Sequence, residues 1–142
     1  MTGKMSADLN LAKKRLIQKN LSLIIVKNGE VLFETESHGI SDLVKAVNKL
    51  GDGIKGSSVA DRIVGRAAAL LFVFSGVKAV FAVTASDGGF EVLAKNKVLC
   101  FYEKRVTHVL NFEKTDACPF EKLVAKLSKP EEAYKILREK CG

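Results

Sequence analysis

The sequence predicts a three-layer α/β/α sandwich with a mixed sheet, opening with a helix and a β-hairpin. Three observations support this fold class: an Asn-Gly turn between two apolar runs, a long apolar segment, and the alternation of helical and strand-like patterns after it. Parallel strands in such an order are joined by right-handed crossovers. At 142 residues the chain can bury one substantial core, so we expect a single domain over residues 1–142.

The first elements are a helix from Ser6 to Lys19 and the hairpin that follows it. Ser6 can cap this helix, whose apolar residues lie along one side while its other side is basic. The runs 21–27 and 30–34 flank Asn28-Gly29, and these two residue types adopt the positive φ angles that a type I′ turn requires. The turn therefore predicts two adjacent antiparallel strands.

The middle of the chain is predicted as two helices joined by a glycine-rich link. The first helix runs from Ser41, its expected cap, to Leu50, and Gly51 ends it. After the link from Gly51 to Gly56, a helix from Val59 to Phe74 is apolar nearly all round, which predicts burial. Gly65 inside that helix would cost about 1 kcal/mol relative to alanine, which indicates close packing against another backbone.

Shorter elements complete the prediction. We expect a central strand over 78–83, a loop over 84–89 and a short helix over 90–95. Two strand-like runs follow, at 98–102 and 106–110, and the pattern does not decide which of them joins the sheet. Asp116 is the expected cap of a helix that begins near Pro119, and Pro130 opens a last helix that ends near Lys140.

Composition limits the classes of partner. The net charge of +7 is spread along the chain, apart from a modest cluster in the first helix (Lys13, Lys14, Arg15 and Lys19). Such a distribution favours solubility and weak attraction to polyanions. Because the sequence offers few exposed-looking aromatic residues and no recognised motif, nucleic-acid binding through the first helix ranks last among the functions considered.

Cysteine spacing and hydropathy indicate a cytoplasmic protein. The three cysteines are odd in number and widely spaced, which predicts neither a disulfide framework nor a zinc knuckle. The charged, amphipathic N-terminal stretch does not resemble a signal peptide. The most apolar run is interrupted at Ser75-Gly76-Val77-Lys78, so we expect no membrane span.

Three segments carry a family resemblance: Val26 to Gly29, Ser58 to Ala69, and Cys118-Pro119. On these segments the chain resembles a small prokaryotic family of unknown function with a cytidine-deaminase-like fold. The resemblance extends from Leu21 to about Leu127. It implies a fold and no established activity.

Active deaminases of that fold need a zinc centre that this sequence lacks. They place a His or Cys and a Glu at the start of the buried helix, and a Pro-Cys-x-x-Cys after the next strand. Ser57 to Arg62 contains no His, Cys or Glu, and Thr84 to Gly89 contains no Cys. Cys118-Pro119 has the wrong order and falls too late in the chain. We therefore predict no metal, no cofactor and no zinc-dependent deamination.

The candidate ligand site combines the polar start of the predicted 59–74 helix with the 84–89 loop. The first N–H groups of a helix lack partners and carry the positive end of its dipole, so they can hold an anion. The candidate binding residues are Lys55, Ser57, Ser58, Asp61, Arg62, Ser86 and Asp87. Capping explains several of them equally well. Gly51 to Gly56 matches G-x-G-x-x-G, but it follows a helix, so an interhelical loop is preferred to a phosphate cradle.

The leading hypothesis is a catalytically degenerate domain that binds a small anionic or nucleotide-like ligand. The alternative is an enzyme without zinc, in which Asp61 acts as acid and base or Cys118 as nucleophile, its thiol activated at a helix N-terminus. The 98–110 region offers a sheet edge at which a second copy would pair to form a homodimer.

Overall fold

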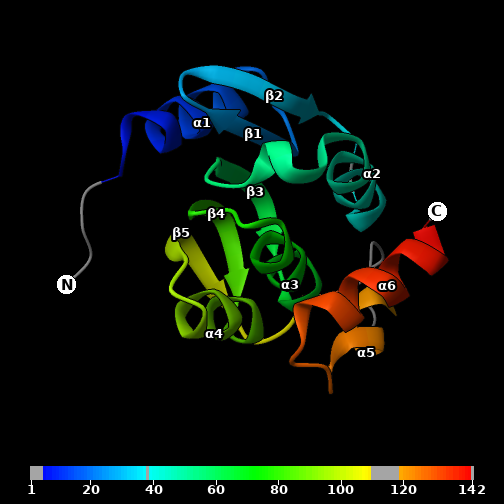
Figure 1. The fold of residues 1–142 in the computed structure, drawn as a ribbon. Helices are drawn as coiled ribbons and strands as arrows, with labels where there is room; N and C mark the ends of the chain where they lie inside the picture. Colours follow the sequence, from blue (N-terminus) through cyan, green and yellow to red (C-terminus); the bar gives the residue numbers. More distant parts are fainter. Residues whose placement is uncertain (1–4, 38, 110–118, 142) are drawn as a thin grey trace.

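The computed structural model describes residues 5–37, 39–109 and 119–141. Its strands form one five-stranded sheet in the order β2-β1-β3-β4-β5 (Figure 1). β1 is antiparallel to both β2 and β3, whereas β3, β4 and β5 are mutually parallel. The strands are β1 (Leu23–Lys27), β2 (Glu30–Thr35), β3 (Ser58–Val64), β4 (Ala79–Ser86) and β5 (Leu99–Val106).

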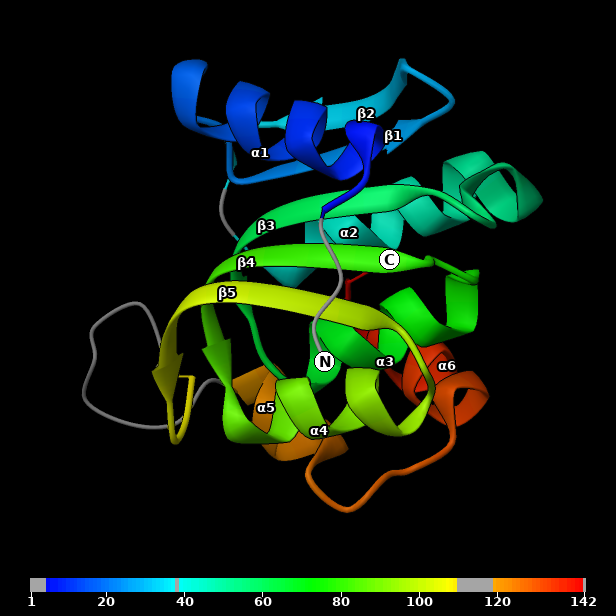
Figure 2. The ribbon, with the colours of Figure 1, turned by 90° about the vertical axis from the view of Figure 1, so that its left-hand side faces the viewer.

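Helices cover both faces of this sheet, which confirms the predicted three-layer α/β/α class. They are α1 (Ala7–Gln18), α2 (Ile40–Leu50), α3 (Arg66–Ser75), α4 (Asp87–Lys95), α5 (Pro119–Val124) and α6 (Pro130–Cys141), with a short 3-10 helix η1 (Gly51–Ile54). Figures 1 and 2 show α1 on one side of the sheet and the other α-helices on the opposite side. No helix within the described ranges is long and apolar enough to cross a membrane.

The predicted opening helix and hairpin are confirmed. The Ser6 hydroxyl accepts a hydrogen bond from Leu9 N at 3.2 Å and caps α1. Asn28 and Gly29 have φ angles of 52° and 78°, as a type I′ turn requires. The Asp8 carboxylate accepts hydrogen bonds from the backbone N–H groups of both turn residues, at 2.8 and 2.9 Å. The helix is thereby joined to the tip of the hairpin.

The predicted helix from Val59 to Phe74 was wrong. Residues 58–64 form β3, the central strand between β1 and β4, and the helix begins only at Arg66. A short segment of mixed pattern can be assigned neither to strand nor to helix by periodicity alone, and the β-branched residues Val59, Ile63 and Val64 favour the strand. Gly65 is the N-cap of α3 in extended conformation, not a glycine inside a helix.

Other boundaries differ by a few residues. α2 begins at Ile40 after Gly39, so Ser41 lies within the first turn and is not its cap. β4 continues through the predicted loop to Ser86, and α4 begins directly after it. Of the two undecided runs, 98–102 joins the sheet as part of β5 (Leu99–Val106), whereas the run 106–110 contributes only Val106 to it. Asp116 lies outside the described residues.

The first residues of α3 and α4 pack closely against one another, and Gly89 allows this approach because it has no side chain. A Cβ at Gly89 would lie 2.7 Å from the carbonyl oxygen of Val64 and 2.9 Å from the carbonyl carbon of Gly65. These neighbours are backbone atoms of the β3–α3 junction, which cannot move aside as a flexible side chain can. Close backbone packing of the kind predicted at Gly65 is therefore present at this junction, but Gly89 is the glycine that requires it, and a Cβ at Gly65 would instead meet the side chains of Glu121 and Val109.

Gly89→Ala is expected to destabilise the protein by about 2 kcal/mol or more, because the added methyl group would overlap fixed backbone. Urea unfolding measures the loss. The matched control is Gly53→Ala, whose added Cβ would meet nothing within 4 Å. Equal stability of the two variants would contradict the close packing of the two helix starts.

Candidate functional site

The structure distributes the predicted site residues along the whole length of β3 and β4. Lys55, Ser57 and Ser58 lie at the amino end of β3, whereas Ser86 and Asp87 lie at the carboxyl end of β4. The two strands are parallel, and at about 3.3 Å per residue these ends are roughly 20 Å apart. The expectation that Lys55 to Arg62 form a helix N-terminus was wrong, because these residues enter and form a strand.

The backbone N–H groups just before β3, at residues 55–57, are not free to bind a phosphate group. The N–H groups of Lys55, Gly56 and Ser57 donate to the carbonyls of Asp52, Gly76 and Ile54, at 3.1, 2.8 and 2.9 Å. The Ser57 and Ser58 hydroxyls are buried and lack hydrogen-bond partners within the described part of the chain. The glycine-rich link is thus a structural turn, as its position after a helix indicated.

Asp61 and Arg62 point to opposite faces of the sheet. Asp61 is paired with Leu23 and Ala82, both of which belong to the core under α3, and paired residues share a face. Arg62 reaches the other face, where its guanidinium donates to the carbonyls of Leu21 and Leu16 at 2.8 and 3.2 Å. The two side chains therefore do not line one pocket, and Arg62 fastens α1 to the sheet.

The carboxyl group of Asp61 has a raised pKa. Loss of hydration through burial raises the pKa of this carboxyl from 3.8 to about 7, and hydrogen bonds from the backbone of Ile63 and Arg62 oppose the rise only in part. The Ile63 N–H donates to Asp61 Oδ1 at 3.4 Å. Near neutral pH this carboxyl therefore exists in both protonation states.

The N-terminus of α3 holds a carboxylate, but from within the chain. The backbone N–H groups of Arg66 and Ala67 donate to the two oxygens of Glu121, each at 2.7 Å. Two short hydrogen bonds to a charged acceptor at the positive end of a helix dipole form a favourable anion site. Gly65 makes room for it, because a Cβ there would lie 2.3 Å from Glu121 Oε1.

The Arg66 side chain binds the other end of α5 and the residues that follow it. Its Nε donates to the carbonyl of Val124 at 3.1 Å, and its Nη2 donates to the carbonyl of Leu127. α5 has only six residues, too few for an isolated helix to be stable. Glu121 and Arg66 thus fix α5 over the start of α3. We call the Glu121 carboxylate with the two α3 N–H groups the Glu121 clasp.

Ser86 and Asp87 lie beside the clasp at the start of α4. Ser86 caps the helix by accepting from Gly89 N at 2.9 Å, so the capping explanation of this residue holds. The exposed Asp87 pairs with Arg105 of β5 at 2.8 Å, and the Arg105 guanidinium lies 4.3 Å from the ring centre of Phe90. Among the predicted binding residues, these two come nearest to the helix starts.

Among the side chains that the structure describes, neither a reactive thiol nor a metal-binding group is found. Cys118 lies outside the described residues. Burial raises the pKa of the Cys100 thiol to about 11, which leaves it protonated and a poor nucleophile at neutral pH. Within the described ranges no group of three or more His, Cys, Asp or Glu residues is placed to hold a metal ion. The corrected helix start, Gly65 to Ala69, also contains no His, Cys or Glu.

The basic cluster of α1 is partly engaged within the protein. Arg15 and Lys19 both contact Glu34, at 3.1 and 2.6 Å, and Lys13 lies 4.8 Å from the ring centre of Phe81. The hydrogen bond from Lys19 lowers the pKa of Glu34. These contacts reduce the charge that the helix presents to a polyanion.

Asp61→Asn is expected to change stability in a pH-dependent manner. Because the folded pKa is raised, the unfolded chain ionises first, and wild-type stability falls as pH rises from about 4 to about 7. Asparagine does not titrate. The free energy of unfolding of the variant, relative to that of wild type, should therefore be roughly 2–4 kcal/mol higher at about pH 8 than at about pH 4. Urea unfolding at both pH values measures this, with exposed Asp52→Asn as control. A difference that is independent of pH would contradict the raised pKa.

Comparison with known proteins supports the predicted family. The family model described as TM1506, domain of unknown function (DUF1893), matches residues 11–141. The crystal structure of a DUF1893 family protein from Thermotoga maritima matches with a TM-score of 0.87 and 29% identity, covering 98% of this chain and 93% of that chain. No curated protein sequence matches significantly.

Two deaminase structures match more distantly. A diaminohydroxyphosphoribosylaminopyrimidine deaminase/5-amino-6-(5-phosphoribosylamino)uracil reductase from Thermotoga maritima has a TM-score of 0.49 and 16% identity, covering 73% of this chain and 34% of that chain. The dCMP deaminase of cyanophage S-TIM5 has a TM-score of 0.48 and 18% identity, covering 70% and 94%. The family match extends over nearly the whole chain, and the chain belongs to the DUF1893 family.

Proposed function

We propose that this protein is a metal-free binding domain that holds the carboxylate or phosphate group of a small molecule, nucleotide-like ligands included, at the N-terminus of α3. The observation that carries the proposal is the carboxylate already bound there by Arg66 N and Ala67 N at 2.7 Å. In the ligand-free chain Glu121 occupies this position, and a ligand anion binds by taking its place.

The position of the clasp in the fold supports this function. It lies where β3 and β4 end and α3 and α4 begin, and α/β proteins commonly bind ligands at the carboxyl ends of parallel strands. Gly65 and Gly89 themselves add no side chain at the two helix starts, which leaves room there for the Glu121 carboxylate. The Arg66 guanidinium, released from the carbonyls of Val124 and Leu127 when α5 moves, supplies a cation for the same anion.

Exchange of one anion for another is energetically reasonable. Glu121 is tethered, so its effective concentration at the site is high and a weak anion such as acetate will not displace it. A phosphate group carries more charge and offers more acceptor oxygens than a carboxylate. A ligand at about 100 times its Kd would stabilise the protein by roughly 2.7 kcal/mol. Thermal unfolding with nucleotides and sugar phosphates would detect such a ligand.

Glu121→Ala tests the site without a known ligand. The variant should lose about 1–3 kcal/mol, because two N–H groups of α3 lose a charged partner. It should then regain stability in acetate or inorganic phosphate, beyond the effect of chloride at equal ionic strength, whereas wild type should respond weakly to acetate. Exposed Glu91→Ala is the matched control.

The amide signals of Arg66 and Ala67 in NMR spectra of Glu121→Ala locate the effect. Both should shift on titration with phosphate if the anion binds at α3. A variant as stable as wild type, or one that acetate and phosphate stabilise no more than chloride does, would overturn the proposed function.

A second candidate, acid–base catalysis by Asp61, is favoured by one observation. A carboxyl with a pKa of about 7 can both donate and accept a proton at neutral pH. Carboxyl carbon-13 NMR of Asp61 measures its titration directly. A midpoint near 7 supports this candidate, and an ordinary midpoint near 4 rejects it.

A further inference from the structure

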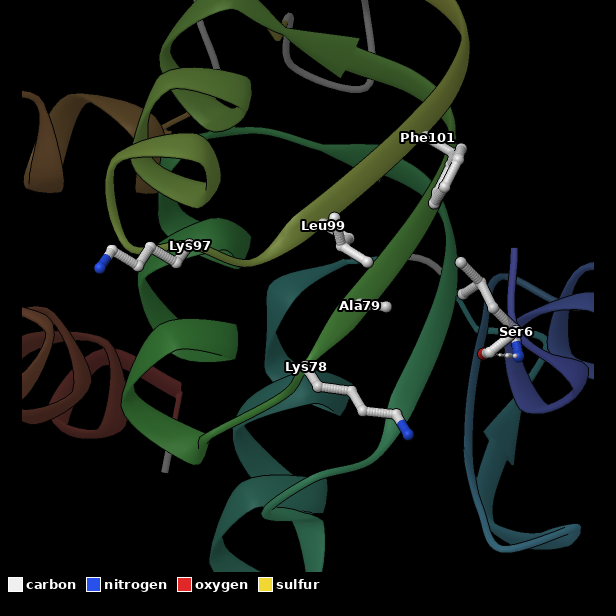
Figure 3. A pocket seen from close by; sticks show the side chains of 7 residues that line it. Ser6, Lys78, Ala79, Lys97, Leu99 and Phe101 are labelled. Carbon is white, nitrogen blue, oxygen red and sulfur yellow. Dashed lines mark hydrogen bonds between the residues drawn. The ribbon is translucent and has the colours of Figure 1, made fainter. Parts of the chain in front are cut away.

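A groove lies on the α1 side of the sheet, away from the Glu121 clasp. Its volume is about 340 Å³, near the lower limit of the roughly 300–1,000 Å³ typical of small-molecule sites. α1 forms one wall, and the first residues of β4 and β5 form the floor and the other wall (Figure 3). The described residues that line it are Ser6, Leu9, Lys78, Ala79, Lys97, Leu99 and Phe101.

The floor of the groove is aliphatic, and its Leu99 part is open to solvent while Ala79 beside it is buried. Ala79 of β4 and Leu99 of β5 are paired and share a face, but α1 covers this face only as far as β4. Leu99 is consequently 53% exposed, although it is a large apolar residue on a strand. Phe101, two residues further on, is partly buried against the α1 core and closes one end. An aliphatic chain laid along this floor would remove apolar surface from water.

The surroundings of the floor are positive. In Figure 3 Lys78 extends from the start of β4 toward the α1 side, whereas the Lys97 side chain points away from Leu99 and Ala79. The N-terminus of α1, at Ser6, adds the positive end of a helix dipole. Asp8 in the first turn is bound to the hairpin N–H groups, and none of the described lining residues is acidic.

We propose that this groove is a second binding site, which takes a carboxylate carrying a medium-length aliphatic chain. The chain lies on Ala79 and Leu99, and the carboxylate lies near the Lys78 ammonium and the start of α1. The site is independent of the clasp, because the two lie on opposite faces of the sheet and share no residue.

Three probes separate the charge from the chain: octanoate, octanol and acetate. Calorimetric titration of the full chain should show saturable 1:1 binding of octanoate. Octanol should bind about fivefold more weakly, because a solvent-exposed ion pair with Lys78 contributes at most about 1 kcal/mol. Acetate, which lacks the chain, should not bind. Absence of saturable octanoate binding, or equal affinity for octanoate and octanol, would overturn the proposal.

The two lysines provide a matched pair of variants. Lys78→Gln should weaken octanoate binding about fivefold, whereas Lys97→Gln, which removes the same charge from a side chain directed away from the floor, should change it less than about twofold. Equal effects would mean that only net charge matters and would contradict the assigned geometry.

A blocking variant tests the floor. Leu99→Glu places a carboxylate in the groove and should abolish octanoate binding. Ile17→Glu changes an exposed apolar residue of α1 that does not line the groove, and it should leave binding intact. Both replaced side chains are about half exposed, so the fold should survive, and amide NMR spectra confirm this. Octanoate should shift the amide signals of Ala79, Leu99 and Phe101. Retention of binding in Leu99→Glu would overturn the proposal.

Discussion

The bond between the Glu121 carboxylate and the start of α3 is the interaction on which the carboxyl end of this sheet depends. It gives partners to Arg66 N and Ala67 N, two N–H groups that the α-helix itself cannot satisfy. It also fixes a six-residue helix that could not form alone, and so places the segment leading to α6 against α3. Local geometry at one helix terminus thus determines how α5 is attached, whereas α6 packs on α3 through its own buried residues Ala133 and Leu137.

Two glycines shape this junction for different reasons. Gly65 leaves space for the carboxylate itself, since a Cβ would lie 2.3 Å from Glu121 Oε1. Gly89 lets the start of α4 approach the backbone of the β3–α3 junction. Neither needs a positive φ angle. Their role is to allow close approach, which brings the N-termini of α3 and α4 together at one end of the sheet.

The parts of the fold that the sequence predicts best are those with local chemical causes. Asn28-Gly29 specifies its turn, and Ser6 specifies a cap, so the opening helix and hairpin were predicted correctly. β3 was predicted as helix because it continues almost directly into the apolar run of α3, and periodicity alone does not separate a short strand from the start of a helix. Gly65, with its unfavourable place in that predicted helix, was the available signal for a boundary.

The candidate site was harder to predict for a physical reason. The sequence argument expected a ligand anion at the terminus of the buried helix and placed that terminus at Ser57 instead of Gly65, and the structure shows a carboxylate of the protein itself at the actual terminus. Its occupant, Glu121, lies 55 residues after Arg66, and no local pattern joins them. Asp61 was singled out for its supposed place at a helix start, whereas its raised pKa comes from burial in the sheet.

A crystal structure of Glu121→Ala grown in phosphate tests the central claim most directly. The account predicts an anion bound to Arg66 N and Ala67 N at hydrogen-bond distance, in the position that the Glu121 carboxylate occupies in the wild-type protein. A helix start that binds only water, or one that another side chain of the protein fills, would contradict it.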